Sequence, residues 1–433
     1  MKIAFITETF LPKIDGITNT LSYTLAHLHA RNHQTLLLAP NCASTSQKIR
    51  LSDLAAFLKP APIYNGIGPS KYITRGQTEA FKNTHIIQYT GFPLPVYPDL
   101  KLVPPWVSLI HSLRDFAPDI IHIVNPFSLG IAGIWATKQL NVPLVASYHT
   151  DSPGFIRRWQ PGAIGNVISS LIWQFNTWLH SHAQLNLCPS QSTYSELHQR
   201  GFKHLKIWGR GVDTQRFSPT KYTTQWRNRL TNGNPQDPLL ITVGRLSREK
   251  RIHWLRPILE QSPNLRLAII GDGPARPELE NLFAGTNTVF TGYLLGEELA
   301  HAYASADIFA FSSANETFGN VALEALASGL PVVAPQAGGV LDFIKHNHNG
   351  LLTAPESQTD FIHAILTLVH NPSLRSQLTQ QARYDAENRS WGRILDQLIE
   401  DYALTHQRFY TTNKTQPNKS KKMAVSWQPE SFA

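Results

Sequence analysis

The sequence has little cysteine and no long uninterrupted apolar run. Only Cys42 and Cys188 occur in 433 residues, which excludes a disulfide scaffold and a cysteine zinc site and predicts a reducing compartment. No stretch approaches the roughly 18 apolar residues of a membrane span, and the N-terminal MKIAFITETF lacks the basic segment and apolar core of a secretory signal. We therefore expect a cytoplasmic protein.

Charge is sparse and unevenly placed. Charged residues make up 16% of the chain, and Lys and Arg exceed Asp and Glu by 39 to 30. Residues 1–206 carry 17 of these cations against 9 acidic residues, whereas residues 207–410 carry 18 against 20. The surplus in the first half indicates an anionic partner, such as a phosphate ligand, a lipid surface or a nucleic acid.

Short apolar runs alternate with segments of helical periodicity in the first half of the chain. The runs lie at residues 2–7, 35–40, 119–124, 143–149 and 184–190, with a helix expected around 20–29. Short buried strands that alternate with helices are typical of parallel sheets covered on both faces. The first half is therefore predicted to be a doubly wound α/β domain.

The second half repeats this alternation. Strands are expected at 239–245, 265–273, 288–293, 307–313 and 331–335, and helices at 276–283 and 320–328. A loop-rich stretch separates the two series, so we expect one domain over 1–206, a second over 207–390 and a cleft between them. A helix over about 391–411 is expected to pack back on the first domain, and 412–433 has the composition of a disordered basic tail.

Two glutamates and a helix start lie together in ANETFGNVALEALASGLPVVAPQAGG, residues 314–339. Glu316 precedes the expected helix, and Glu324 lies within it. The N–H groups of a helix start bind diphosphate, and carboxylates accept hydrogen bonds from sugar hydroxyls. Taken singly, Glu316 also fits a favourable charge at a helix start, and Glu324 a solvated helix face.

Two cations lie close to the end of a predicted strand in VGRLSREK. Arg245 is at the strand end, and Lys250 follows five residues later. Facing a cleft, they suit a diphosphate whose negative charge grows as a sugar leaves. Gly244 lets the backbone approach such phosphates. The simpler interpretation is a pair of surface cations, which is what we expect of the neighbouring Arg248 and Arg251.

These motifs together resemble family 4 glycosyltransferases, a retaining group with the two-domain GT-B fold. The resemblance extends to about residue 405 and rests on ETFLPKIDGI, SYHT, WGRGVDTQRF, VGRLSREK, IIGDGPARPEL and the glutamate block. It implies an α/β protein whose first domain binds an acceptor and whose second domain binds a UDP- or GDP-linked sugar.

The resemblance also implies roles for four charged residues. Arg245 and Lys250 match the pair that binds the donor diphosphate and stabilises the departing nucleoside diphosphate. Glu316 matches the residue that holds the donor sugar hydroxyls, and Glu324 the residue that anchors the ribose.

Five further positions match donor-binding positions of the family. Backbone N–H groups of Phe318, Gly319 and Asn320 are expected near the sugar and the phosphates. Gly16 matches a glycine whose backbone approaches the phosphates, and His149 matches a histidine that contacts the sugar near the reacting carbon.

The family implies a mechanism without an agreed enzyme nucleophile, so Asp151 is not assigned as a base. In this front-face substitution the leaving phosphate oxygen helps take the acceptor proton, and catalysis depends on positioning and phosphate stabilisation. No DxD-type metal motif is present, and Arg245 with Lys250 supplies the charge that a divalent ion supplies elsewhere. We therefore expect no cofactor and no required metal.

Segments of the chain resemble two lipid-directed branches of the family. TETFLPKIDGI, GFPLPVYPDLKL and NVPLVASYHT resemble sulfoquinovosyldiacylglycerol synthases, whereas SYHTDSPGF, WGRGVDT and ANETFGN resemble lipid α-mannosyltransferases. The resemblance implies transfer of a mannosyl, glucosyl or sulfoquinovosyl group to a membrane glycerolipid or glycolipid. A soluble sugar or polysaccharide acceptor stays open as the alternative.

One segment combines cations with large apolar residues. It contains Arg157, Arg158, Trp159, Ile168, Leu171, Ile172, Trp173, Phe175 and Trp178. With the positive first half, it suits a peripheral enzyme on the anionic inner face of a membrane. Helical spacing of apolar residues also fits core packing, which we favour for Trp173 and Phe175.

A nucleic-acid-binding protein is the other class that the charge suggests. No helix-turn-helix, zinc-finger or RNA-recognition motif accompanies the basic residues. We therefore expect no nucleic-acid partner.

Overall fold

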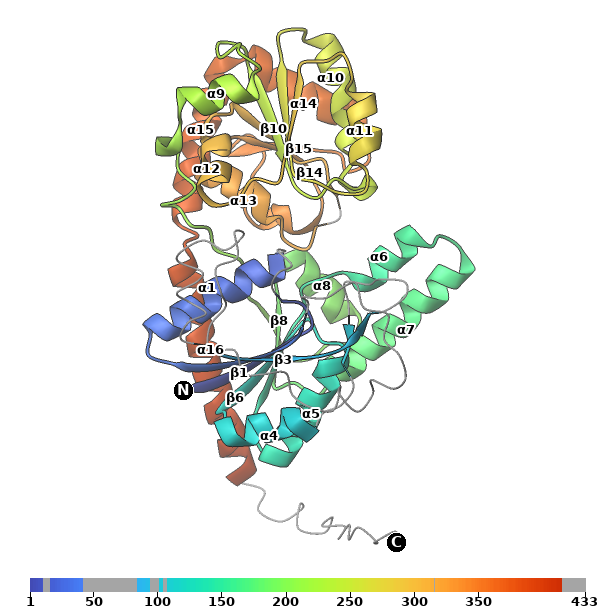
Figure 1. The fold of residues 1–433 in the computed structure, drawn as a ribbon, viewed down its shortest axis with the longest axis vertical. Coiled ribbons are helices and arrows are strands. Elements are labelled where there is room, and N and C mark those ends of the chain that lie inside the picture. Colours follow the sequence, from blue (N-terminus) through green and yellow to red (C-terminus); the bar gives the residue numbers. More distant parts are fainter. Residues whose placement is uncertain (11–15, 42–83, 94–100, 104–106, 315, 415–433) are drawn as a thin grey trace.

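The computed structural model describes residues 1–10, 16–41, 84–93, 101–103, 107–314 and 316–414. Two parallel sheets lie one above the other along the long axis of the molecule, each flanked by helices (Figure 1). The predicted pair of doubly wound α/β sheets is confirmed. The expected tail beyond Lys414, and the side chains of Arg158 and Trp159, lie outside the described part of the chain.

The first sheet has seven parallel strands in the order β3-β2-β1-β6-β7-β8-β9. Their bounds are β1 Lys2–Thr7, β2 Gln34–Pro40, β3 His85–Tyr89, β6 Ile120–Val124, β7 Leu144–Ser147, β8 Leu185–Cys188 and β9 Leu205–Ile207. A separate antiparallel pair is formed by β4 (Phe92–Pro93) and β5 (Lys101–Leu102). The central strands are almost wholly apolar because both faces of the sheet are covered.

Helices cover both faces of this sheet. They are α1 Gly16–Ala30, α4 Val107–Phe116, α5 Ser128–Leu140, α6 Ser152–Trp159, α7 Ala163–His180 and α8 Gln191–Gln199. On one face α4 and α5 pack in a cluster that includes Leu109, Leu129 and Ile121. On the other, α1 and the C-terminal helix α16 pack in a cluster that includes Phe5 and Leu398.

The second sheet has six strands in the order β12-β11-β10-β13-β14-β15, also all parallel. The strands are β10 Leu239–Val243, β11 Arg266–Ile270, β12 Thr288–Gly292, β13 Ile308–Ala310, β14 Val332–Pro335 and β15 Gly350–Thr353. The α-helices are α9 Thr224–Leu230, α10 Arg256–Gln261, α11 Arg276–Leu282, α12 Gly296–Ala304, α13 Asn320–Ala327, α14 Gln358–His370 and α15 Pro372–Glu387. Short 3-10 turns lie at Pro219–Lys221, Arg248–Lys250, Ile252–Leu255 and Gly338–Asp342.

The C-terminal helix α16 spans Trp391–Lys414 and runs back along the first sheet (Figure 1). Trp391, Leu395 and Tyr402 are buried against β1 and α1. The helix ends at Lys414 rather than near residue 411, so the first three positions of the expected disordered tail are helical. No helix in the described part of the chain is long and apolar enough to cross a membrane.

Besides the short pair β4 and β5, three strands of the two parallel sheets were not expected from the sequence. They are β3 at the edge of the first sheet, β9 at its other edge, and β15 at the edge of the second. All three are edge strands and are short, and β9 is only partly buried. Each holds at most two consecutive apolar residues, in HIIQY, LKI and GLLT, so none stands out as an apolar run in the sequence.

Candidate active site

The loop before α13 meets the first domain across the cleft. The Thr317 hydroxyl donates a 3.0 Å hydrogen bond to the carbonyl oxygen of His149. A Cβ atom on Gly16, the first residue of α1, would lie 3.2 Å from Nδ2 of Asn320, the first residue of α13. Residues that are distant in the sequence, namely Gly16, His149 and 317–320, thus form one site.

Lys250 and Glu316 face each other within this site. The Lys250 ammonium pairs with a Glu316 carboxylate oxygen, and both side chains are partly exposed, at 27% and 23%. Lys250 ends a 3-10 turn, and its carbonyl oxygen accepts a hydrogen bond from the Ser312 hydroxyl. The predicted cation and carboxylate are therefore neighbours, and water or a ligand can reach both.

A pair of glycines supports the loop that carries Glu316. The Gly339 N–H donates to the Glu316 carbonyl oxygen at 2.8 Å. A Cβ atom on Gly339 would lie 2.2 Å from the Thr317 carbonyl oxygen. Only glycine fits such an approach, so the GG of PQAGG fixes the height of the loop above the sheet.

The start of α13 offers polar groups without side-chain caps. Gly319 occupies the N-cap position with φ of 94°, and no side chain caps the helix. Phe318 is buried and packs against Phe343 at 5.1 Å between ring centroids, so its backbone alone faces the site. The buried Asn320 Oδ1 has no hydrogen-bond partner among the residues that the structure describes. This helix start can accept an anion at its N–H groups.

Arg245 lies after β10, where two loops cross closely. A Cβ atom on Gly271 would lie 1.9 Å from the Gly244 carbonyl oxygen, so the crossing needs glycine. The Arg245 side chain is exposed, and within the described ranges it has no ion-pair partner. By contrast, Arg251, which was expected to be a surface cation, is only 17% exposed and pairs with Glu356 at 2.7 Å.

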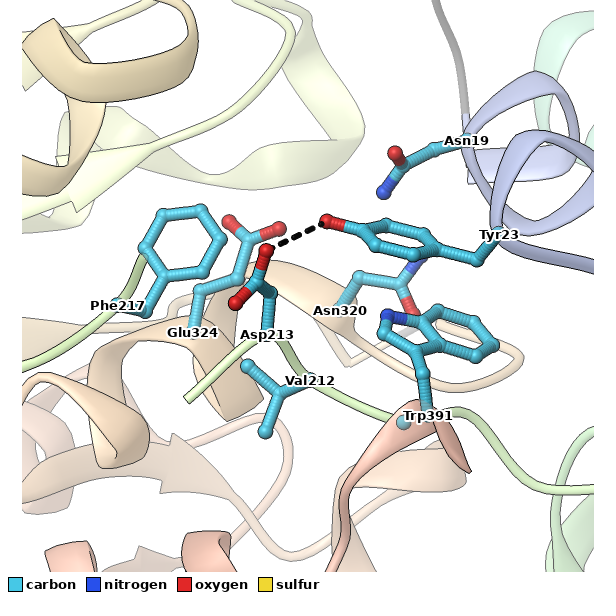
Figure 2. A pocket seen from close by; sticks show the side chains of 9 residues that line it. Asn19, Tyr23, Val212, Asp213, Phe217, Asn320, Glu324 and Trp391 are labelled. Atoms are coloured by element: carbon cyan, nitrogen blue, oxygen red, sulfur yellow. Dashed lines mark hydrogen bonds between the residues drawn. The ribbon is translucent and has the colours of Figure 1, made fainter. Parts of the chain in front are cut away.

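Glu324 lines a small hollow between the two domains (Figure 2). The Tyr303 hydroxyl donates to Glu324 Oε2 at 3.2 Å. Burial raises the pKa of Glu324 to about 7, although the Tyr303 hydrogen bond and the positive charge of Arg216 act in the opposite direction. Glu324 is therefore not part of a solvated helix face.

The opposite wall of the hollow belongs to the first domain and the connection between domains. Figure 2 shows Tyr23 of α1 pointing toward Asp213, with Asn19 beside it. The Tyr23 hydroxyl donates to Asp213 at 3.5 Å, and its ring stacks on Trp391 at 4.9 Å. Sequence reasoning missed these residues. Their signal was that Asn19 and Tyr23 follow Gly16 at helical spacing, on the face that looks into the cleft.

His149 is buried, with an exposed fraction of 8%. Both ring nitrogens have partners, because Nδ1 accepts from Arg210 at 2.7 Å and Nε2 lies 2.8 Å from the Ser147 hydroxyl. A contact between the ring nitrogens and a donor sugar, as predicted from the sequence, would require an exchange of these hydrogen bonds. Asp151 accepts a hydrogen bond from the Gly154 N–H at 2.8 Å and caps α6.

Two family models match the chain, one to each domain. The model described as "Glycosyltransferase Family 4" matches residues 14–216, and "Glycosyl transferases group 1" matches residues 225–385. The first match covers Gly16 and His149, and the second covers Arg245, Lys250, Glu316 and Glu324.

Curated relatives and solved structures agree with these matches. The chain is 33% identical over 412 residues to a GDP-mannose-dependent α-mannosyltransferase of Mycobacterium tuberculosis, with 94% of this chain and 98% of the relative covered. It is 37% identical to the sulfoquinovosyl transferase SQD2 of Arabidopsis thaliana, over 73% of this chain and 62% of that protein. Anabaena HepE, solved in complex with UDP, has the same fold, with a TM-score of 0.68, 20% identity, and coverage of 93% of this chain and all of that chain. The chain therefore belongs to the family 4 glycosyltransferases and has their GT-B fold.

Proposed function

We propose that the protein transfers a hexose from a nucleotide-sugar to a membrane lipid or glycolipid, with retention of configuration. The observation that carries this proposal is the meeting of Lys250, Glu316 and the uncapped start of α13 at one edge of the cleft. Cations and helix N–H groups at one place suit a diphosphate. A carboxylate beside them suits sugar hydroxyls.

The donor is held by the second domain. Arg245 and Lys250 bind the diphosphate, and the N–H groups at the start of α13 add hydrogen bonds to it. Glu316 accepts from sugar hydroxyls, and Glu324 accepts from the ribose. Gly16 and Gly244 let the backbone of each domain approach the phosphates. A screen that compares UDP-linked with GDP-linked sugars identifies the base of the donor, uracil or guanine.

The residues of the site act by position and charge. As the bond between sugar and phosphate breaks, Arg245 and Lys250 neutralise the charge that grows on the diphosphate. The leaving phosphate oxygen takes the acceptor proton on the same face of the sugar, so no side chain is needed as nucleophile. We propose that these two cations replace a divalent ion, and that transfer continues in excess chelator.

The acceptor side is proposed to meet an anionic membrane surface through α7. Ile164, Val167, Leu171 and Trp178 are 65, 60, 58 and 47% exposed, and their spacing places them on one face of the helix. Trp173 is buried and Phe175 packs against the core, so the stripe consists of the other apolar residues. With the positive first half, this suits a peripheral enzyme on the cytoplasmic leaflet.

Relatives support a lipid acceptor. One is named an α-monoglucosyldiacylglycerol synthase, from Streptococcus pneumoniae, and is 22% identical over 94% of this chain. A second relative of that name, from Acholeplasma laidlawii, is 23% identical over 88% of this chain. A donor screen against diacylglycerol, glycolipid and soluble sugar acceptors, read as nucleoside diphosphate release, tests the proposal. Transfer to soluble sugars alone would support the alternative acceptor class.

The membrane surface has its own test in vesicle flotation. Val167→Glu combined with Leu171→Glu is expected to abolish binding to anionic vesicles, because charge replaces the apolar stripe. Tyr384→Glu is the control, since Tyr384 is 63% exposed on the second domain. Equal flotation of all three proteins would remove α7 as the membrane contact.

A further inference from the structure

A buried guanidinium lies beside the cleft with only neutral partners. Arg210 is 4% exposed, and its Cζ atom lies 4.7 Å from the centroid of the Trp208 ring. Nη1 donates to the Trp208 carbonyl oxygen at 2.8 Å, and Nη2 donates to His149 Nδ1 at 2.7 Å. In the described part of the chain no carboxylate pairs with it. Removing a charge from water without an ionic partner costs free energy of folding, so a buried Arg210 indicates a structural or functional role.

Arg210 fixes the direction of a chain of hydrogen bonds. A guanidinium only donates, so His149 Nδ1 must accept, and the neutral ring carries its proton on Nε2. That proton points to the Ser147 oxygen at 2.8 Å, and the Ser147 hydroxyl then donates to His122 Nε2 at 3.0 Å. His122 carries its proton on Nδ1, 2.6 Å from the Tyr402 hydroxyl.

Both histidines are neutral in this chain. Burial lowers the pKa of His122 to about 3 and that of His149 well below its ordinary value, and the positive charge of Arg210 lowers both further. Each ring therefore holds a single proton, and the two rings are opposite tautomers. The chain runs from the connection between the domains, beneath the cleft, to helix α16.

The backbone of His149 contacts the loop that precedes α13, residues 316–319, which we call the donor loop. Its carbonyl oxygen accepts from the Thr317 hydroxyl, and Thr317 follows Glu316 in the sequence. We propose that Arg210 is a positioning residue of sugar transfer, which holds His149 in one tautomer and orientation so that its backbone meets the donor loop. This inference rests on the proposed function and adds a residue to which no donor contact is assigned.

Three variants test the role in transfer. Arg210→Met removes the donors and the charge at similar length, and kcat is expected to fall roughly 100-fold, as for other misplaced sites, with the donor KM near that of wild type. Arg210→Lys keeps a donor and is expected to restore part of kcat. Arg229→Met is the matched control, because Arg229 lies 4.6 Å from the Trp226 ring but is exposed.

A double-mutant cycle tests the route. If Arg210 acts through His149 and Thr317, the fold-loss of kcat in the double variant Arg210→Lys, Thr317→Val is smaller than the product of the two single losses. Losses that multiply would mean that Arg210 acts elsewhere, and would overturn the proposal. Wild-type kcat in the folded Arg210→Met variant would also overturn it.

The tautomers are measurable without any activity. In long-range ¹H–¹⁵N spectra of the wild type, His149 is expected as the Nε2–H form and His122 as the Nδ1–H form. Arg210→Met is expected to change the His149 signal, whereas Tyr402→Phe leaves it unchanged, because the direction is set at the Arg210 end. An Nδ1–H form of His149 in the wild type would overturn the proposal, even if sugar transfer is found. The expected tautomers without transfer to any acceptor would instead refute the proposed function.

Discussion

The two walls of the cleft hold their polar groups in opposite ways. On the second domain, Arg245 is exposed and the Lys250 and Glu316 side chains keep about a quarter of their surface in water. On the opposite wall, His149 and His122 of the first domain and Arg210 of the connection between the domains are 8, 0 and 4% exposed and form one chain of hydrogen bonds. The wall of the second domain is accessible to a charged ligand, whereas the polar groups of the opposite wall are buried and held by hydrogen bonds to one another.

This difference has a physical consequence. A charge in contact with water exchanges partners at low cost when a ligand arrives, so Lys250 can move from Glu316 to a phosphate. A buried polar group has no such substitute, and losing one partner leaves the other unsatisfied. Substitutions on the second wall should therefore change transfer while sparing stability, and those on the first wall should change stability as well.

The largest effect is expected at the cations of the second wall. Lys250→Ala or Arg245→Ala should lower kcat by about 10²–10³, the usual loss when a group that stabilises growing charge is removed. The melting temperature should change little, because both side chains are at least partly exposed. Steady-state assays of nucleoside diphosphate release measure the loss.

Arg248→Ala is the control for these variants. Arg248 lies in the same 3-10 turn as Lys250, is 86% exposed and pairs with Glu278 at 3.3 Å. It should transfer like the wild type. If Arg248→Ala were as damaging as Lys250→Ala, the charge of the turn rather than the position of Lys250 would matter.

Glu324 should affect donor binding more than the chemical step. Glu324→Gln removes charge-assisted hydrogen bonds to ribose, each contributing about 1.5–3 kcal/mol, so the donor KM should rise by one to two orders of magnitude. Because the pKa of Glu324 is raised to about 7, wild-type affinity should fall as the pH decreases through 7 and the carboxylate gains a proton. Calorimetric titration with a nucleoside diphosphate between pH 6 and 8 tests both. Equal pH dependence in Glu324→Gln would contradict the assignment.

A smaller effect is expected at Glu8, within the first domain. Glu8 is 1% exposed and accepts from the N–H groups of Phe127 and Gly130 at the start of α5. Burial raises its pKa from 4.5 to about 7, so the folded state holds a proton that the unfolded state releases. Its contribution to stability is therefore present below pH 4.5 and is lost as the pH rises through 7, by an amount on the order of 3 kcal/mol.

Glu8→Gln should flatten this dependence. The amide keeps an oxygen for the two N–H groups and offers its own N–H to the Ser128 hydroxyl oxygen. Its melting temperature should exceed that of the wild type at pH 8 and match it near pH 5. Glu298→Gln, at an exposed position of α12, should follow the wild type throughout. If the wild-type melting temperature instead rose from pH 5 to 8 relative to that of Glu8→Gln, ionised rather than protonated Glu8 would be the form that stabilises the fold.

The smallest effect is expected at Asp151. Asp151→Asn keeps the cap of α6, and Asp151→Ala removes it at a cost of about 1 kcal/mol. Neither should change the transfer rate by much, because the carboxylate serves the helix start. A large loss of kcat in Asp151→Asn would make it a catalytic group.

The sequence was sufficient where pattern and chemistry coincide. The strand expected at 2–7 is β1, and the helix expected at 320–328 is α13 within one residue. Lys250 and Glu316 were expected in one site, and they form an ion pair 66 residues apart. Such a site can be predicted from sequence because the carboxyl ends of parallel strands lie at the same edge of a sheet.

Contacts that depend on the packing of the domains could not be predicted from the sequence. Arg210 and His149 are 61 residues apart, and nothing in WGRGVD marks its arginine as buried. Tyr402 reaches His122 across 280 residues because α16 lies against the first sheet. Their meeting is decided by how helices and connections pack over strand ends, and not by local periodicity.

The path of α16 has a consequence for synthesis. One face of the first sheet is completed by Trp391, Leu395 and Tyr402, yet its last strand ends at Ile207. At about 5–20 residues per second, roughly 10–40 s separate the emergence of these segments from the ribosome. Throughout that interval an apolar surface around Phe5 lacks its natural cover. The nascent chain therefore needs protection from aggregation until its second domain has been made, and a chain truncated before residue 391 should be insoluble.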